Sequence, residues 1–192
     1  MSEISSCSWP SNDPLMIRYH DEEWGVPIHD DLKLFEFMTL DAFQAGLSWK
    51  TVLNKRENFR KAFDGFDPEK IVRYGTAEYE RLMADAGIIR NRAKINGTIQ
   101  NAICFLEVQK EFGTFDKYIW QFTGGKTLFN GLKNLQEMPS SSKESDAMSA
   151  DLKARGFKFV GSTICYAFMQ AAGMVNDHLV QCNIYKKLRG VN

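Results

Sequence analysis

The sequence predicts an all-α protein, and three observations lead to this prediction. Apolar residues recur with helical spacing in several segments, and few segments show the apolar–polar alternation of period two that strands show. Prolines are scarce, and each stands where a helix would begin or end. The 192 residues, 44% of them hydrophobic, suffice for one domain with a substantial core or for two small lobes that share one. We therefore expect residues 1–192 to form one all-α domain with two lobes.

The composition narrows the classes of function. The formal net charge is zero, so the overall composition does not indicate a nucleic-acid-binding protein. Any DNA-binding face must be a local cluster of positive charge. The chain has no apolar run of about 18 residues, and its start lacks the basic and then apolar pattern of a signal peptide. We therefore expect a cytoplasmic protein without a membrane span. In that compartment the four cysteines are more typical of thiols or metal ligands than of disulfides.

Three helical stripes are expected in chain order. In each stripe, residues three or four positions apart lie on one side of a helix. The first comprises Leu34, Met38, Asp41 and Ala45; the second comprises Ile95, Ile99, Ala102, Ile103 and Leu106; the third comprises Val160, Ile164, Ala167, Phe168 and Ala171. The prolines that would bound the helices are Pro10, Pro14, Pro27, Pro68 and Pro139. The serine-rich run after Pro139 is expected to be a loop between the two lobes.

Asp41 is the one charged member of the first stripe. A carboxylate that faces a core is destabilising unless it is paired or hydrogen-bonded. The residue therefore either serves a function or caps a neighbouring helix, and the pattern favours neither reading. Aromatic residues are frequent near it in the sequence, namely Trp9, Tyr19, Trp24, Phe43 and Trp49. Such a cluster is usually core, but aromatic faces beside one carboxylate also describe a pocket for a flat cationic base.

A helix–hairpin–helix pattern is expected at about residues 145–173. Ser145 is a suitable N-cap for the first helix, Gly156 would end it, and the second helix would end near Gly173.

The link between these helices carries the features of a phosphate contact. Gly156 and Gly161 allow backbone N–H groups to approach one DNA phosphate, and the start of the second helix adds its dipole. Lys153, Arg155 and Lys158 lie beside the link. The alternative is an ordinary helix–helix turn without DNA contact, because such turns are common.

Two Cys/His pairs stand near opposite ends of the chain. His178 and Cys182 are four residues apart and would share one face of a helix, while twelve residues separate Cys7 from His20. Together they make a Cys₂His₂ set, which suits a tetrahedral structural zinc ion without an open position. Such an ion would close a loop of nearly the whole chain. The alternative is two unrelated pairs, because the spacing matches no compact zinc finger. Cys104 and Cys165 lie in apolar segments and are expected to be core thiols.

Several motifs, taken in order, resemble the DNA-3-methyladenine glycosylase I family. The resemblance covers the chain from Cys7 to about Cys182. The matching segments are Asp13–Leu15, Tyr19–Pro27, Gln44–Trp49, Lys55–Asn58, Asp85–Ile95, Arg155–Tyr166 and Val175–His178.

This resemblance implies a helix–hairpin–helix glycosylase fold in which one structural zinc ion joins the termini. The zinc ligands of the family fall on Cys7, His20, His178 and Cys182. The walls of its base pocket fall on Tyr19 and Trp49, which would sandwich the base, with Trp24 close by. Its pocket acid, the expected catalytic residue, falls on Asp41. Gly156, Lys158 and Gly161 would contact DNA.

The implied reaction is removal of alkylated bases, mainly 3-methyladenine, from double-stranded DNA. N3-alkylation makes adenine a cation and a good leaving group, so extrusion of the base and its selective binding supply most of the catalysis. Asp41 would accept hydrogen bonds from the exocyclic amine, and water would attack the sugar carbon. No lysine is placed as a Schiff-base nucleophile, so strand cleavage is not expected. The protein would act as a monomer and release free 3-methyladenine.

Two positions depart from the pattern of the family. Asp41-Ala42 stands where the family usually has Glu-Gly, and Met16 stands where many members have a pocket tyrosine. The shorter acid reaches less far, which puts the substrate geometry in question. Asp177, next to a zinc ligand, is expected to have at most a structural or phosphate-proximal role. The competing hypotheses are a non-catalytic binder of alkylated DNA with the same fold and zinc, and an unrelated hydrolase with an open zinc site.

Overall fold

The computed structural model describes residues 7–190, and this part of the chain is mostly helical. The α-helices are α1 (Pro14–Glu22), α2 (Asp31–Gln44), α3 (Trp49–Leu53), α4 (Arg56–Ala62), α5 (Pro68–Ile71), α6 (Thr76–Ala84), α7 (Arg92–Phe112), α8 (Phe115–Trp120), α9 (Lys143–Ala154), α10 (Ser162–Ala171) and α11 (Asn183–Arg189). Three short 3₁₀ helices are η1 (Asp64–Phe66), η2 (Gln121–Thr123) and η3 (Leu135–Glu137). Strands β1 (Leu128–Phe129) and β2 (Val175–Asn176) pair in parallel over two residues each. The prediction of a mostly helical protein without a substantial sheet is confirmed for the described residues.

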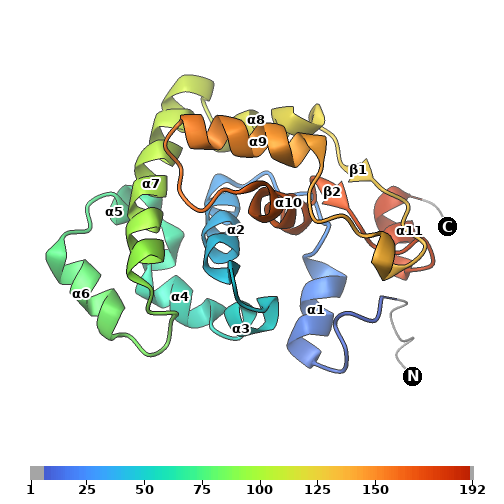
Figure 1. Cartoon of the computed structure of the whole chain (residues 1–192), viewed down its shortest axis with the longest axis horizontal. Helices are drawn as coiled ribbons and strands as arrows, with labels where there is room; N and C mark the ends of the chain where they lie inside the picture. The colour runs from blue at the N-terminus through green and yellow to red at the C-terminus, as the bar shows by residue number, and fades with distance from the viewer. Residues whose placement is uncertain (1–6, 191–192) are drawn as a thin grey trace.

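Helix α2 lies at the centre of the molecule, with α3, α7, α8 and α10 packed around it (Figure 1). Its N-terminus is capped by the Asp30 side chain, which accepts a hydrogen bond from the Lys33 backbone N–H at 2.8 Å. Every residue from Leu34 to Phe43 is buried. The predicted stripe was therefore too narrow, because a helix enclosed on all sides buries its whole circumference. Asp41 is inside the protein for this reason, and its position on a stripe is incidental.

The stripe predicted on α7 is partly wrong. Ile95 and Ala102 are fully buried as expected, but the Ile103 side chain is 40% exposed. Lys94 and Asn101 take places on the buried face of the helix instead. These two polar residues make hydrogen bonds to the backbone of neighbouring segments, and a count of apolar residues does not detect such bonds.

Helices α9 and α10 form a helical hairpin joined by residues 155–161. The N-cap of the first helix stands three residues before the predicted one: Ser142 is the N-cap, and Ser145 completes a reciprocal capping box with it. The error arose because both serines hydrogen-bond at this terminus. Gly156 ends α9 with φ +93°, a conformation that favours glycine. Near the end of α10, Gly173 has φ +70° and lies so close to the Val26 backbone that a Cβ would clash at 2.2 Å.

The two ends of the described chain lie on the same side of the molecule (Figure 1). The main apolar core extends without interruption from α1 through α10 to β2. A second, small cluster lies between the ends and consists of Cys7, Leu132, Leu179, Cys182 and Tyr185. The serine-rich run after Pro139 is a loop that leads into α9, and Pro14 and Pro68 are the first residues of α1 and α5. Within residues 7–190, no helix has the length and apolar character needed to cross a membrane.

Candidate functional site

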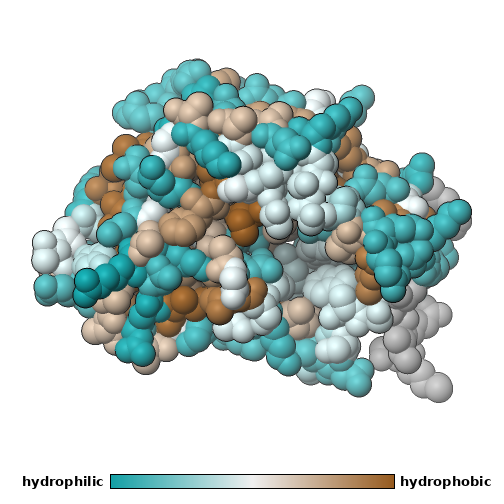
Figure 2. Space-filling view, in the orientation of Figure 1, coloured by the Kyte–Doolittle hydropathy of each residue, from teal (hydrophilic) through white to brown (hydrophobic). Residues whose placement is uncertain are grey.

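A cavity of about 280 Å³ opens where α1, α2, α3 and α10 meet. Figure 2, in the orientation of Figure 1, shows a hollow in the surface at this place. The residues that line the cavity are Trp9, Tyr19, Trp24, Asp41, Gln44, Trp49, Leu135, Met138, Ala167 and Gln170. All four predicted pocket residues are among them. Met16 and Phe43 are buried in the core and do not line the cavity.

Local structure fixes the walls of the cavity. Trp49 is the first residue of α3, and the Ser48 side chain caps that helix by accepting from the Thr51 backbone N–H at 3.2 Å. The preceding turn is held by Lys94, whose Nζ donates to the Phe43 and Ala45 carbonyl oxygens at 2.7 Å each. A lysine from α7 thus closes the C-terminus of α2, where unpaired carbonyls and the helix dipole favour a cation.

Three lining residues carry buried polar atoms that lack a hydrogen-bond partner among the described residues. These atoms are Trp9 Nε1, Trp49 Nε1 and Asp41 Oδ2. A buried polar atom without a partner destabilises the fold by about 1–3 kcal/mol, so its retention favours a ligand as the missing partner. Burial also raises the pKa of the Asp41 carboxyl well above its usual range. The cavity therefore offers two donors and one acidic acceptor inside aromatic walls.

The aromatic walls contact one another. The centroids of Tyr19 and Trp49 are 5.0 Å apart with an interplanar angle of 44°, and Trp9 lies 5.1 Å from Trp24. A flat ring between two others needs a separation of roughly 7 Å, twice the contact distance of stacked carbon atoms. The expectation that Tyr19 and Trp49 enclose a base between them is therefore not met in this conformation.

The four predicted metal ligands come together although they stand at opposite ends of the sequence. The ligand atoms of Cys7, His20, His178 and Cys182 all lie within 4.8 Å of one another, and all four residues are buried. His20 Nε2 is 3.0 Å from His178 Nδ1, and Cys182 Sγ is 3.9 and 3.7 Å from these two nitrogens. Tetrahedral zinc with sulfur and nitrogen ligands requires separations of about 3.3–3.8 Å. The observed separations of 3.0, 3.7 and 3.9 Å bracket this range, so the donor set could hold such an ion after small shifts of the side chains.

The outer nitrogen of each imidazole is held by an oxygen atom. His20 Nδ1 donates to the Asp21 carboxylate at 2.6 Å, and His178 Nε2 donates to the Trp24 carbonyl at 2.8 Å. With these outer nitrogens held by oxygen atoms, the inner nitrogens are the ones that point into the cluster. Hydrogen bonds from Cys7 and the two histidines hold the pKa of the Cys182 thiol well below its usual value, against the opposing effect of burial. This arrangement is typical of metal-ligating histidines and thiolates.

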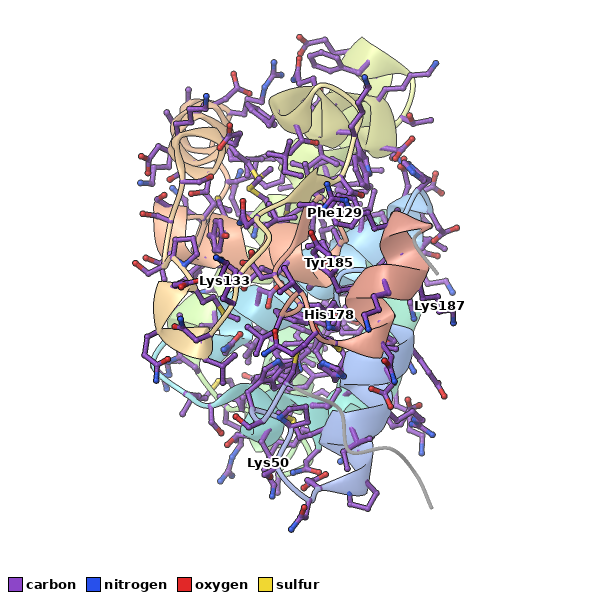
Figure 3. The ribbon with its side chains drawn as sticks, turned by 90° about the vertical axis from the view of Figure 1, so that its right-hand side faces the viewer. Lys50, Phe129, Lys133, His178, Tyr185 and Lys187 are labelled. Atoms are coloured by element: carbon purple, nitrogen blue, oxygen red, sulfur yellow. The ribbon has the colours of Figure 1, made fainter. Side chains whose placement is uncertain are left out.

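The cluster is joined to the cavity. Tyr19 precedes the ligand His20, and Trp24 contributes its carbonyl to His178 and its ring to the cavity wall. Figure 3, which views the molecule from the side of the termini, shows His178 between α1 and α11 in projection. An ion at the cluster would therefore fix both the two ends of the chain and one wall of the cavity.

The turn between α9 and α10 carries the three residues predicted to contact DNA; Lys158 is exposed, and Gly156 and Gly161 are half-buried. Asn101 on α7 holds the turn: the Lys158 backbone N–H donates to Asn101 Oδ1 at 2.7 Å, and Asn101 Nδ2 donates to the Lys158 carbonyl at 3.1 Å. The Lys158 side chain is exposed. A Cβ at Gly161 would meet no atom within 4 Å, and its φ of −63° is open to any residue. The fold itself does not require glycine at this position.

Sequence reasoning did not assign a site role to Trp9, Gln44, Met138 or Gln170. Trp9 belonged to the aromatic cluster that was singled out, which was the available signal. Gln170 stands three residues after Ala167 on α10, so the two share a helix face. Its polarity at the edge of an apolar stripe was the signal that was overlooked.

A helical fold, a buried four-residue Cys/His cluster and an aromatic cavity with one buried acid together define a helical base-excising glycosylase. Residues 9–186 match the methyladenine glycosylase family, and the chain belongs to this family. The predicted family and enzyme class, a hydrolase of N-glycosyl bonds in DNA repair, are confirmed.

Two relatives illustrate the match. The chain is 51% identical over 182 residues to DNA-3-methyladenine glycosylase 1 of Escherichia coli (strain K12), with coverage of 95% of this chain and 97% of the relative. It is 44% identical over 176 residues to DNA-3-methyladenine glycosylase of Haemophilus influenzae, covering 92% and 95%. Among solved structures, a crystal structure of 3-methyladenine DNA glycosylase I has 49% identity and a TM-score of 0.90, covering 92% of this chain and 97% of that one. The Staphylococcus aureus enzyme, described for its recognition of 3-methyladenine, has 32% identity and a TM-score of 0.90, covering 93% and 95%.

Proposed function

We propose that the protein excises alkylated bases, mainly 3-methyladenine, from double-stranded DNA by flipping the base into the aromatic cavity and hydrolysing its N-glycosidic bond. The observation that carries the proposal is the buried, unpartnered carboxylate of Asp41 among aromatic walls. A relative of 32% identity and TM-score 0.91 was solved in complex with 3-methyladenine, which supports the same ligand here.

The proposed reaction needs little covalent help from the protein. N3-alkylation places a positive charge on the base, so the base departs with the electrons of the glycosidic bond and becomes neutral. Water forms the new bond to the sugar carbon and loses a proton to solvent. Asp41 accepts a hydrogen bond from the exocyclic amine, and a cationic base favours the ionised form of this acid. No lysine is among the described residues that line the cavity, which supports base removal without strand cleavage.

DNA would be held by the turn between α9 and α10. This turn contains Gly156, Lys158 and Gly161, and its backbone N–H groups and one cation can meet a phosphate.

The loop between α2 and α3 supplies a second contact with DNA. Its Leu47 side chain is 43% exposed beside the cavity residues Gln44 and Trp49, and an exposed apolar side chain there suits a wedge between base steps. One copy of the chain carries all of these parts, so we propose that it acts as a monomer.

The Cys/His cluster would hold one structural zinc ion. Its four protein ligands leave no open position, and the ion would therefore stabilise the fold without activating water. This closed set argues against a hydrolase that uses an open zinc site. The second candidate, a non-catalytic binder of alkylated DNA, has the same fold and differs only in that it would not release the base.

The decisive experiment measures free 3-methyladenine released from methylated duplex DNA. The wild type is expected to release the base, and Asp41→Asn should reduce the rate roughly 10- to 100-fold, the effect of losing one charged hydrogen bond. Asp64→Asn is the matched control, because Asp64 accepts a hydrogen bond from Tyr74 outside the cavity. Tight binding of methylated DNA by the wild type with no release would establish the non-catalytic binder instead.

A further inference from the structure

Gln170 is a cavity residue whose side-chain amide is held in one orientation. It lies on α10, three residues after the lining residue Ala167. Its Nε2 donates a hydrogen bond of 2.7 Å to Asp177 Oδ2. Asp177 therefore decides which end of the Gln170 amide faces away from the cavity.

Asp177 is a buried carboxylate with only donors around it. Its side chain is 1% exposed, and it accepts from Asn130 Nδ2, the Tyr166 hydroxyl and Gln170 Nε2, each at 2.7 Å. Tyr166 in turn accepts from Asn130 Nδ2 at 3.0 Å, so the directions of all these hydrogen bonds are mutually fixed. A carboxylate can only accept hydrogen bonds. If the Gln170 amide were reversed, its Oε1 would face Asp177 Oδ2 with no proton between them, so Nε2 is the atom that faces Asp177.

The fixed amide leaves the Gln170 side chain one acceptor atom for a ligand. With Nε2 committed to Asp177, the remaining polar atom of the Gln170 side chain is Oε1, and no described residue donates a hydrogen bond to it in this structure. Asp41 on α2 supplies the first acceptor from another wall. An exocyclic amine has two N–H groups and can satisfy both acceptors, whereas a 6-oxo purine presents an oxygen at the same edge.

We propose that Gln170 is a specificity-determining residue of the base cavity and that Asp177 is its positioning residue. Together they hold the Gln170 carbonyl toward the bound base, so that the cavity prefers 6-amino purines to 6-oxo purines. The inference rests on the proposed base-excision function and adds to it a physical basis for the choice of base. A protein site built around a hydrogen bond rejects a ligand that leaves its polar groups unpaired.

The test compares binding of two free bases, 3-methyladenine and 3-methylguanine, followed by quenching of tryptophan fluorescence. The wild type is expected to prefer 3-methyladenine. In Asp177→Asn, the new amide can donate to Gln170 Oε1 while the Tyr166 hydroxyl turns to accept, which reverses the Gln170 amide. The preference for 3-methyladenine over 3-methylguanine, measured as the ratio of their dissociation constants, should then fall by about tenfold or more.

Gln170→Met keeps the side-chain length without a polar end. It should weaken 3-methyladenine binding about three- to tenfold and leave 3-methylguanine binding unchanged.

The control is Asp151→Asn. This carboxylate also accepts from a tyrosine hydroxyl, that of Tyr118 at 2.6 Å, but does not line the cavity, so the ratio should stay at the wild-type value. Melting temperature and metal content are recorded for every variant, and Gln170→Met decides the question if Asp177→Asn does not fold. Equal weakening of both bases in the variants, or an unchanged ratio, would overturn the inference. If the wild type binds neither base, or releases no base from methylated DNA, the proposed function itself has failed.

Discussion

At the scale of single residues, Asp41 shows how burial and function oppose each other. The acid is 2% exposed, and its Oδ2 has no partner among the described residues. Desolvation disfavours the charged form, so the folded state holds the proton more tightly than the unfolded chain does. Natural proteins keep such a group when it binds a ligand, although its burial lowers the stability of the protein without the ligand.

This conflict predicts a stabilising substitution. Because the folded pKa of Asp41 is raised, its contribution to stability is fully present below the unfolded pKa near 4 and is lost as pH rises toward the folded pKa. Asp41→Asn removes this loss, so its melting temperature should exceed that of the wild type. The difference should grow from pH 4 to pH 8 and reach at least about 2–4 °C, the shift that 1 kcal/mol produces in a protein of this size. Thermal scans at several pH values measure it; a difference that is constant or negative across this range would contradict the desolvation account.

The sequence pointed to some of these residues and not to others for a physical reason. Asp41, Tyr19 and Trp49 were identified because a charge in an apolar stripe and a group of aromatics are visible in the chain itself. Gln170 and Lys94 were not, because their roles consist of distant partners: Asp177 for one, and the Phe43 and Ala45 carbonyls for the other. No local pattern contains these hydrogen bonds.

At the scale of elements, periodicity found the helices better than it found their faces. The stripe on α7 failed at Ile103 because the buried face of that helix is used by Lys94 and Asn101 to hold two turns. Both turns serve the site, since one positions α3 and the other presents Lys158. Helices α9 and α10 fall within the region where the sequence predicts a helix–hairpin–helix pattern, and Gly156 and Gly173 have positive φ angles, which favour glycine. The assignment of this helix pair to a DNA-binding motif stays a prediction.

A substitution at Gly161 can test for DNA contact with little effect on the fold. The Gly161 backbone has φ −63° and open space at the position of a Cβ, so Gly161→Ala should lower the melting temperature by only about 1–4 °C, the effect of placing a poorer N-cap residue at the start of α10. If a phosphate approaches the backbone here, the added methyl group should weaken binding of duplex DNA several-fold and leave binding of free 3-methyladenine unchanged. Fluorescence anisotropy with labelled duplex measures the first, and tryptophan quenching measures the second. Unchanged DNA affinity would place the phosphate contact elsewhere.

Lys158→Ala is the companion change on the same turn. Loss of one phosphate contact should weaken DNA binding for all sequences alike and reduce the slope of log affinity against log salt by about one. The backbone of the turn stays fixed by Asn101, so the effect reports the lost charge alone.

At the scale of the whole molecule, the fold brings together two ends that spacing could not connect. Cys7 and His20 lie near the start and His178 and Cys182 near the end, and no compact finger pattern joins them in the sequence. The resemblance to a family indicated the full set, and the structure places the four ligand atoms within 4.8 Å of one another. An ion held there would close a loop from Cys7 to Cys182 and would act mainly by restricting the unfolded chain.

This arrangement predicts that metal, stability and base binding are lost together. The purified protein should contain one zinc ion per chain, and Cys182→Ser should lose it and lower the melting temperature by at least about 10 °C. Binding of free 3-methyladenine should weaken as well, because Tyr19 adjoins His20 and the Trp24 carbonyl accepts from His178. Cys104→Ser is the matched control, since this buried thiol lies outside the cluster and should keep the zinc. Elemental analysis and thermal scans decide the matter. A Cys182→Ser variant that retains both its zinc and its melting temperature would show that the ends of the chain are held together by packing alone, and the wall of the cavity would then owe its position to the aromatic contacts among Trp9, Tyr19 and Trp24.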